Sequence, residues 1–429
     1  MSATALAPVR PADAVIHPPS PSDERRVIEL ADGRMARVSP AIGQLWTAID
    51  GAATAAQLAD RLGEQWTPEL VHAGIEALLD AHLIDSPAAD DTQPKSGGGG
   101  HKEGAGRRFR LGDAGALQLT LFKDLDKWRF ARWAGRVLGG RAAACLALGL
   151  GAAGFVNMIW HWNSFATAVS TPTGPLDPVL LLLAMVAATS LHELGHAVRA
   201  INVGGRVRRV GVMLLYLSPA MFCDITDTWR LSKQARVTTA LAGGAASAAI
   251  AGACSLAFSA AGSHSPVLAA LALAMSAMLV VNLLPLVKFD GYIALMSHLD
   301  LPNLRQRAML AWKTRLAAAL RPVQGDAQTD PLLDKPWAVP YGLAASAAPL
   351  VLLFSLATQL GASLAGMGAL GVALRSCIVL AVLVILLRGA WRTLAALRRA
   401  GVAPIRTLGL SAGVTALTVT GLLSFQIPQ

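Results

Sequence analysis

Long apolar runs occupy most of the chain beyond residue 140. Seven segments approach the roughly 20 apolar residues that a membrane-spanning helix needs. They lie near residues 142–161, 179–199, 237–261, 266–287, 338–361, 369–389 and 407–425. The sequence therefore predicts a mainly α protein, a polytopic transmembrane bundle of about six to seven spans.

An amphipathic stretch precedes the first of these segments. Phe130, Trp133 and Val137 share one face of a predicted helix, and three arginines line an adjacent face. Aromatic and cationic faces of this kind are typical of a helix that lies at the membrane surface.

The front of the chain has a different pattern. Short β-prone runs at 27–30 and 35–38 flank an Asp-Gly pair, which predicts a hairpin. Three helical stretches follow, the second capped by Thr54 and the third by Thr67. A hairpin followed by three helices predicts a small winged-helix-like α+β domain.

Composition divides the chain into four parts. Residues 1–24 are rich in proline and predict a disordered leader, and 25–86 hold the small domain. Residues 87–107 are glycine-rich and predict a flexible linker. Residues 108–429 carry all the long apolar segments and are expected to form a membrane-embedded domain.

The low content of charged residues indicates a membrane protein. Charged residues make up only 15% of the chain, against about 25% in a typical soluble domain. Residues 1–100 hold 7 Lys and Arg against 14 Asp and Glu, whereas the remainder holds 30 against 13. A basic membrane domain needs no nucleic acid partner, because Lys and Arg gather on cytoplasmic loops and contact anionic lipid in the bilayer.

The same rule predicts an orientation. The loops at 163–177, 262–265 and 362–368 contain no Lys or Arg, whereas the loops that alternate with them carry several basic residues, mostly Arg. Because positive loops stay in the cytoplasm, the N-terminus is expected on the cytoplasmic side of a membrane that the chain crosses several times. The high content of Ala, Gly and Arg suggests a bacterial chain, so this membrane is expected to be the bacterial cytoplasmic (inner) membrane.

The second apolar segment ends in H-E-L-G-H at residues 192–196. On a helix, His192 and His196 lie on one face, so they can bind one Zn²⁺ ion, with Glu193 beside it as the catalytic acid and base. A catalytic zinc needs three protein ligands and an open water position. Two histidines and a glutamate inside a membrane are costly unless they act together.

The third ligand must come from another segment. Asp290, followed by Gly291 near the end of the fourth apolar segment, can present a carboxylate oxygen to zinc, or it can be an interfacial residue paired with Lys288. Asp224 is the alternative third ligand. Asp224 and Asp227 nevertheless fit a solvated cytoplasmic turn better than a ligand role.

H-E-L-G-H on one membrane segment, followed on a later one by Asn282 and Asp290-Gly291, resembles the site-2 protease family of intramembrane zinc metalloproteases. The resemblance implies that Asp290 is the third zinc ligand and that Asn282 holds the substrate near the metal. The family usually has Pro after this Asn; here Leu283 takes its place, and Pro285 comes two positions later.

The resemblance is closer to one branch, the peptide zinc metalloproteases with a PqqD-like front domain. Residues 217–230 and 290–305 are similar to that branch, and 25–86 resemble PqqD-like domains, which recognise peptides in ribosomal peptide-modification pathways. This implies an endopeptidase whose front domain captures a ribosomally synthesised precursor peptide. The β-prone run 210–216 corresponds to an edge strand of the family, or it is ordinary core.

Two other functions fit the same residues. One is regulated proteolysis of a membrane-anchored factor, and the other is a non-catalytic role in peptide export or immunity. An intact Glu193 argues against the second, because a protein that only binds peptide needs no general base. The sequence does not predict an oligomeric state.

Overall fold

The computed structural model describes most of the chain. The described residues are 8–11, 13–19, 24–30, 35–84, 109–111, 117–171, 174–215, 218–320 and 335–364, with isolated residues between 368 and 395. They divide into two compact units, 1–283 and 284–429. The protein is mainly helical, with a small antiparallel sheet near the N-terminus.

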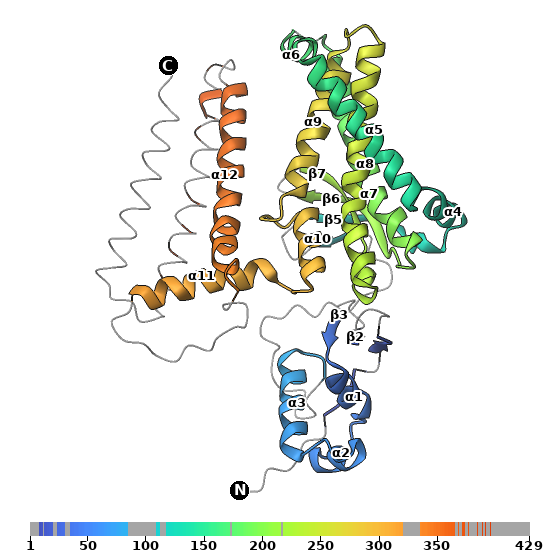
Figure 1. Cartoon of the computed structure of the whole chain (residues 1–429), viewed down its shortest axis with the longest axis vertical. Helices are drawn as coiled ribbons and strands as arrows, with labels where there is room; N and C mark the ends of the chain where they lie inside the picture. The colour runs from blue at the N-terminus through green and yellow to red at the C-terminus, as the bar shows by residue number, and fades with distance from the viewer. Residues whose placement is uncertain are drawn as a thin grey trace. The chain divides into compact units, whose positions relative to one another are not determined.

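The front of the first unit is a three-stranded antiparallel sheet followed by three helices (Figure 1). In chain order the elements are β1 (Val15–His17), β2 (Arg26–Glu29), β3 (Met35–Val38), α1 (Pro40–Ala48), α2 (Ala55–Leu62) and α3 (Pro68–Asp80). β2 and β3 form the predicted hairpin. β1 lies inside the segment that the sequence predicts to be disordered, and it pairs with β2.

Local sequence signals set the helix starts in this domain. Thr54 accepts a hydrogen bond from the backbone of Gln57, whose side chain accepts one from the Thr54 backbone, so the pair forms a capping box. Ser39 and Thr67 cap the other two helices. The helices bury a common apolar core with the sheet, which gives the front of the chain its own hydrophobic centre.

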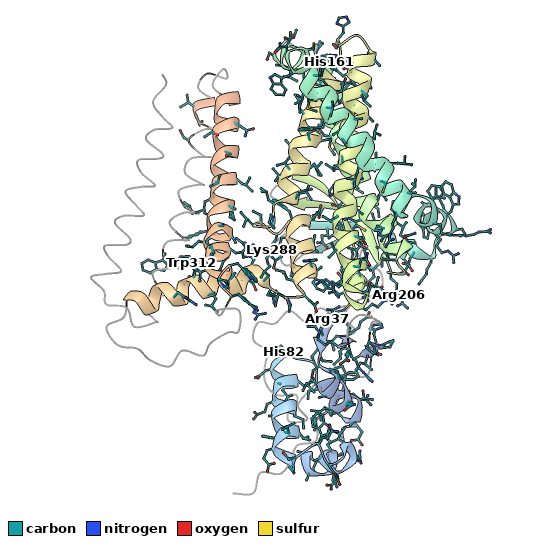
Figure 2. The ribbon with its side chains drawn as sticks, in the orientation of Figure 1. Arg37, His82, His161, Arg206, Lys288 and Trp312 are labelled. Carbon is teal, nitrogen blue, oxygen red and sulfur yellow. The ribbon has the colours of Figure 1, made fainter. Side chains whose placement is uncertain are left out.

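The rest of the first unit contains six helices in the described residues. They are α4 (Arg129–Leu138), α5 (Arg141–Trp160), α6 (Trp162–Ser170), α7 (Asp177–Asn202), α8 (Lys233–Ala260) and α9 (Pro266–Leu283). His161 lies at the junction of α5 and α6 (Figure 2). Helices α5, α7, α8 and α9 have 18 to 28 residues and are apolar enough to cross a membrane. They coincide with the first four predicted segments and indicate a multi-pass membrane protein.

Helix α8 is the centre of this group, since it packs against α5, α7 and α9. Its contact with α5 is made by small residues: a Cβ atom added to Gly154 would collide with the backbone of Gly252. Beside this contact, Asn157 donates hydrogen bonds to the hydroxyl groups of Ser255 (3.1 Å) and Ser259 (2.9 Å). Close backbone approach and interhelical hydrogen bonds are the usual sources of helix association in a membrane.

A second sheet belongs to the same unit. Its antiparallel strands lie in the order β4 (Phe109–Leu111), β5 (Leu117–Lys123), β6 (Arg209–Leu215) and β7 (Ser218–Asp224). The β-prone run at 210–216 corresponds to β6, which is an inner strand. The edge strand beside it is β7, a segment whose sequence pattern does not predict a strand.

The second unit contains α10 (Asp290–Leu299), α11 (Leu304–Leu320) and α12 (Ala338–Leu364). Helices α11 and α12 pack together, and Trp312 of α11 (Figure 2) donates a hydrogen bond to Ser346 of α12 at 3.0 Å. α12 coincides with the fifth predicted segment. The predicted segment 407–425, and most of 369–389, lie outside the described residues.

The close contact between α5 and α8 gives a matched test of the fold. We expect Gly154→Val to lower the thermal unfolding midpoint in detergent, because overpacking costs about 1–3 kcal/mol or more. Gly149→Val, on the same helix with no atom within 4 Å of its added Cβ, is the control. Equal midpoints for the two variants would show that α5 and α8 do not approach at Gly154.

Candidate metal centre

Two histidines of α7 form the buried part of the candidate site. Their spacing of four residues places them on one face of the helix. That face is covered, so His192 and His196 are only 3% and 5% exposed, although most of α7 is not buried within the protein. Burying two imidazoles in a membrane-length helix is costly unless both have polar partners.

Helix α8 supplies those partners. The Nδ1 atom of His196 lies 2.8 Å from the backbone oxygen of Thr239, and that of His192 lies 2.8 Å from the hydroxyl group of Ser247. A carbonyl oxygen only accepts, so Nδ1 of His196 carries the proton and Nε2 keeps its lone pair. The Ser247 hydroxyl can accept from His192 in the same way. Partners of this kind fix the ring orientation and tautomer of metal-binding histidines.

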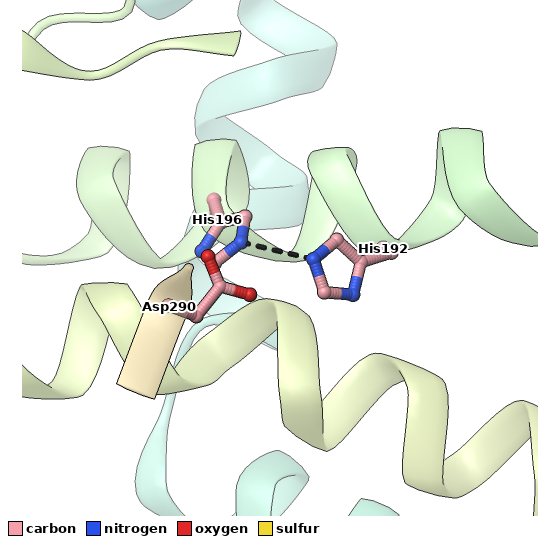
Figure 3. A group of neighbouring side chains, drawn as sticks. All are labelled: His192, His196 and Asp290. Carbon is pink, nitrogen blue, oxygen red and sulfur yellow. Dashed lines mark hydrogen bonds between the residues drawn. The ribbon is translucent and has the colours of Figure 1, made fainter. Parts of the chain in front are cut away.

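The two Nε2 atoms point toward each other and are 3.2 Å apart. With zinc–nitrogen bonds of about 2.0–2.1 Å, this separation corresponds to an angle of about 100° at the metal, close to tetrahedral. Asp290 completes the group: its carboxylate and the two imidazoles offer atoms that all lie within 4.8 Å of one another (Figure 3). This buried group can hold a metal ion.

A glycine lets helix α8 lie directly against the two imidazoles. A Cβ atom added to Gly243 of α8 would lie 2.7 Å from Nε2 of His192 and would also collide with Nε2 of His196. Any larger residue at this position would therefore push the imidazoles out of place. The donor set of two imidazoles and one carboxylate fits a small cation.

Glu193 lies on α7 between the two histidines and is half-buried. Helix α7 packs against β7, the edge strand of the second sheet. On β7, burial, followed by the negative charges of Glu193 and Asp224, raises the pKa of the Cys223 thiol. The sequence motif did not indicate this neighbourhood, because β7 and α7 are separated along the chain.

Asp224 is held away from a ligand role by its own partners. Its carboxylate accepts hydrogen bonds from Arg209 (3.0 Å) and from the hydroxyl of Thr226 (2.8 Å). Burial raises the pKa of Asp224, but the hydrogen bonds from Thr226 and Arg209 outweigh burial, and the net pKa is below its usual range. In the described part of the chain, the group able to hold a metal contains Asp290 and not Asp224.

Asp227 is fully buried and has a structural role. It accepts hydrogen bonds from the backbone of Arg206 (2.7 Å) and from the side chain of Arg230 (2.9 Å), and so ties two loops together. Asn282, the predicted substrate-holding residue, lies in the last turn of α9 and is half-buried. α9 packs against α7.

No protein-family model, curated protein or solved structure matches this chain.

Adjacent glycines of α8 give a test of the metal centre. We expect Gly243→Ala to lose most of the metal that the wild-type protein binds, because the new methyl group collides with both imidazoles and moves their nitrogens apart. Gly244→Ala is the control, since its Cβ comes no nearer than 3.3 Å to another side chain, that of Leu279. The thermal unfolding midpoint of each variant separates metal loss from unfolding, because the collision at Gly243 also costs packing energy.

Metal content is measured by elemental analysis of the purified variants. Equal metal in Gly243→Ala and Gly244→Ala would contradict a site at the convergence of His192 and His196.

Proposed function

We propose that this chain is an intramembrane zinc endopeptidase of the site-2 protease type. His192, His196 and Asp290 hold the zinc, and Glu193 is the catalytic acid and base. The observation that carries the proposal is the convergence of the two imidazole Nε2 atoms, each fixed by a polar partner on α8, within the same motif that carries Glu193.

The donor set favours zinc among the common metals. Two neutral imidazoles and one carboxylate are the ligands of many catalytic zinc sites, whereas Ca²⁺ and Mg²⁺ prefer all-oxygen sites. Three protein ligands leave a fourth position for water. One zinc ion per chain is the expected stoichiometry.

Zinc held by His192, His196 and Asp290 would supply Lewis-acid chemistry, because it would make a water molecule acidic near neutral pH and would polarise the scissile carbonyl. Glu193 takes a proton from the attacking water as the bond between its oxygen and the carbonyl carbon forms. Glu193 then delivers that proton to the amide nitrogen as the carbon–nitrogen bond breaks. The products are a carboxylic acid and an amine, and Glu193 returns to its starting state.

An extended substrate suits the surroundings of Glu193. β7 is an edge strand, and an extended peptide can add to such an edge through backbone hydrogen bonds. Because Glu193 lies near Cys223 of β7, a peptide paired there would pass close to the catalytic carboxylate. Asn282 would hold the same peptide, as in the family that the motif resembles.

The front domain, residues 25–86, would capture the substrate. Its sequence resembles PqqD-like domains, whose ligands are ribosomally synthesised precursor peptides. β1 pairs with one side of β2, so the edge strands of this sheet are β1 and β3. We assign the peptide to β3, the edge strand of the hairpin, and α3 would form the other wall of the groove. The acidic balance of the first hundred residues favours a basic stretch in the peptide. The linker at 87–107 would raise the local substrate concentration at the metal.

The proposed topology has about six to seven spans, with the N-terminus in the cytoplasm of a bacterium. The distribution of Lys and Arg between loops supports it. Cleavage would then take place near the cytoplasmic face, the side at which both the second and fourth apolar segments end.

A direct test mixes the purified protein with peptides encoded beside its gene and identifies cut products by mass spectrometry. In this assay we expect Glu193→Gln to retain its zinc and to lose at least about 100-fold in kcat, since Gln cannot accept the proton of water. His196→Ala, the control, should lose both zinc and activity. Turnover by Glu193→Gln at the wild-type rate would exclude Glu193 as the base.

Removal of the front domain tests the substrate class. We expect a chain lacking residues 1–100 to bind the same amount of zinc but to cut a full-length precursor with a KM about tenfold higher or more, because the tether is lost. A short peptide that contains only the cleavage site is the matched control, and both enzymes should cut it equally. An unchanged KM for the full-length precursor would rule out peptide capture by this domain.

A further inference from the structure

A large apolar cavity lies on the face of α7 opposite the metal centre. Its volume is about 1300 Å³, above the roughly 300–1,000 Å³ that is usual for small-molecule sites. Its walls come from α4, α5, α7, α8, α9 and the nearby sheet, all within the first unit. The histidines do not line it, whereas Leu191, Leu194 and Gly195 do.

Most of the residues that line the cavity belong to the membrane-length helices α5, α7, α8 and α9. Leu148 of α5, Leu191 of α7 and Leu241 of α8 line it and are 56%, 52% and 38% exposed. Exposed leucines on helices of this type face lipid chains, so the cavity is accessible from the bilayer. Trp128 and Trp133 line the part formed by α4, and tryptophan is enriched where the bilayer meets water.

One end of the cavity is cationic. Arg141, the first residue of α5, and Arg199, in the last turn of α7, both line it, and their charges repel each other. The guanidinium group of Arg199 is held by neutral acceptors, among them the Thr238 hydroxyl (3.0 Å) and the Gly139 backbone oxygen (2.7 Å). None of the lining residues that the structure describes is an aspartate or glutamate.

Among its described lining residues, the cavity has two arginines and no carboxylate at one end, and its other walls are mostly apolar. A molecule with an anionic head and an apolar body would match both parts. We propose that this cavity binds a phospholipid with a net negative headgroup. Its phosphate lies at Arg141 and Arg199, and an acyl chain extends between α5, α7 and α8. The charge match selects an anionic lipid over a neutral one, and the apolar wall selects a lipid over free phosphate.

The test uses the full-length protein in mild detergent, equilibrated with equal amounts of phosphatidylglycerol and phosphatidylcholine that carry the same acyl chains. Native mass spectrometry counts the lipids retained. We expect one phosphatidylglycerol per chain, preferred by about fivefold or more, since each arginine near the surface adds affinity for anionic lipid. Millimolar inorganic phosphate should not displace it.

Two variants locate the site. Arg141→Gln should abolish most of the preference, whereas Arg136→Gln should keep it, because Arg136 makes the same charge change on α4 and does not line this cavity. Ala249→Trp fills the apolar wall without changing charge, and it should reduce retention of both lipids. Thermal unfolding midpoints confirm that each variant is folded.

Three outcomes would overturn the proposal. Equal retention of the two lipids by the wild-type protein would show that Arg141 and Arg199 do not select an anionic headgroup. An equal effect of Arg136→Gln and Arg141→Gln would indicate that anionic lipid is attracted to the basic protein surface in general and not to this cavity. A retained apolar peptide in place of lipid, or displacement of the lipid by inorganic phosphate, would assign the cavity to a different ligand.

Discussion

The contact between α7 and α8 is the constraint on which the candidate site depends. It buries two imidazoles in a region where polar groups are costly, and it gives each Nδ1 atom one hydrogen-bond acceptor, the Ser247 hydroxyl for His192 and the Thr239 backbone oxygen for His196. Those same bonds turn both Nε2 atoms toward one point. The same hydrogen bonds between α7 and α8 therefore stabilise the buried imidazoles and orient their candidate ligand atoms.

Small residues make that interface possible. Gly243 lets α8 lie close against the two imidazoles, and Gly252 lets α8 approach α5. In a bilayer, apolar surface gives little driving force for helix association, so close approach and interhelical hydrogen bonds take its place. The glycines, serines and threonines of α8 thus serve both the packing of the bundle and the shape of the candidate metal centre.

The two sides of α7 differ in chemistry. One side carries the buried histidines, while the other lines the apolar cavity with Leu191 and Leu194. Glu193 lies between these faces, near Cys223 of the edge strand β7. One helix therefore brings the candidate metal ligands, the candidate base and a lipid-facing surface together, because its 3.6-residue repeat sends successive side chains in different directions.

The sequence by itself determined the features that are local. Apolar runs of spanning length predicted α5, α7, α8 and α9, and turn and capping residues predicted the hairpin and helices of the front domain. The spacing of four residues predicted that His192 and His196 share a face. These results follow because segment length, caps and helical periodicity depend only on neighbours along the chain.

The tertiary structure alone decided what depends on distant segments. Spacing left Asp290 open between a ligand and an interfacial residue, and Asp290 is the acid that lies within reach of the two histidines. Ser247, Thr239 and Gly243 carry no motif, and β7 has no strand pattern. Their roles exist only because α8 packs on α7 and β7 pairs with β6. A hydrogen bond or an open space between two segments is a property of both, so neither sequence segment contains it.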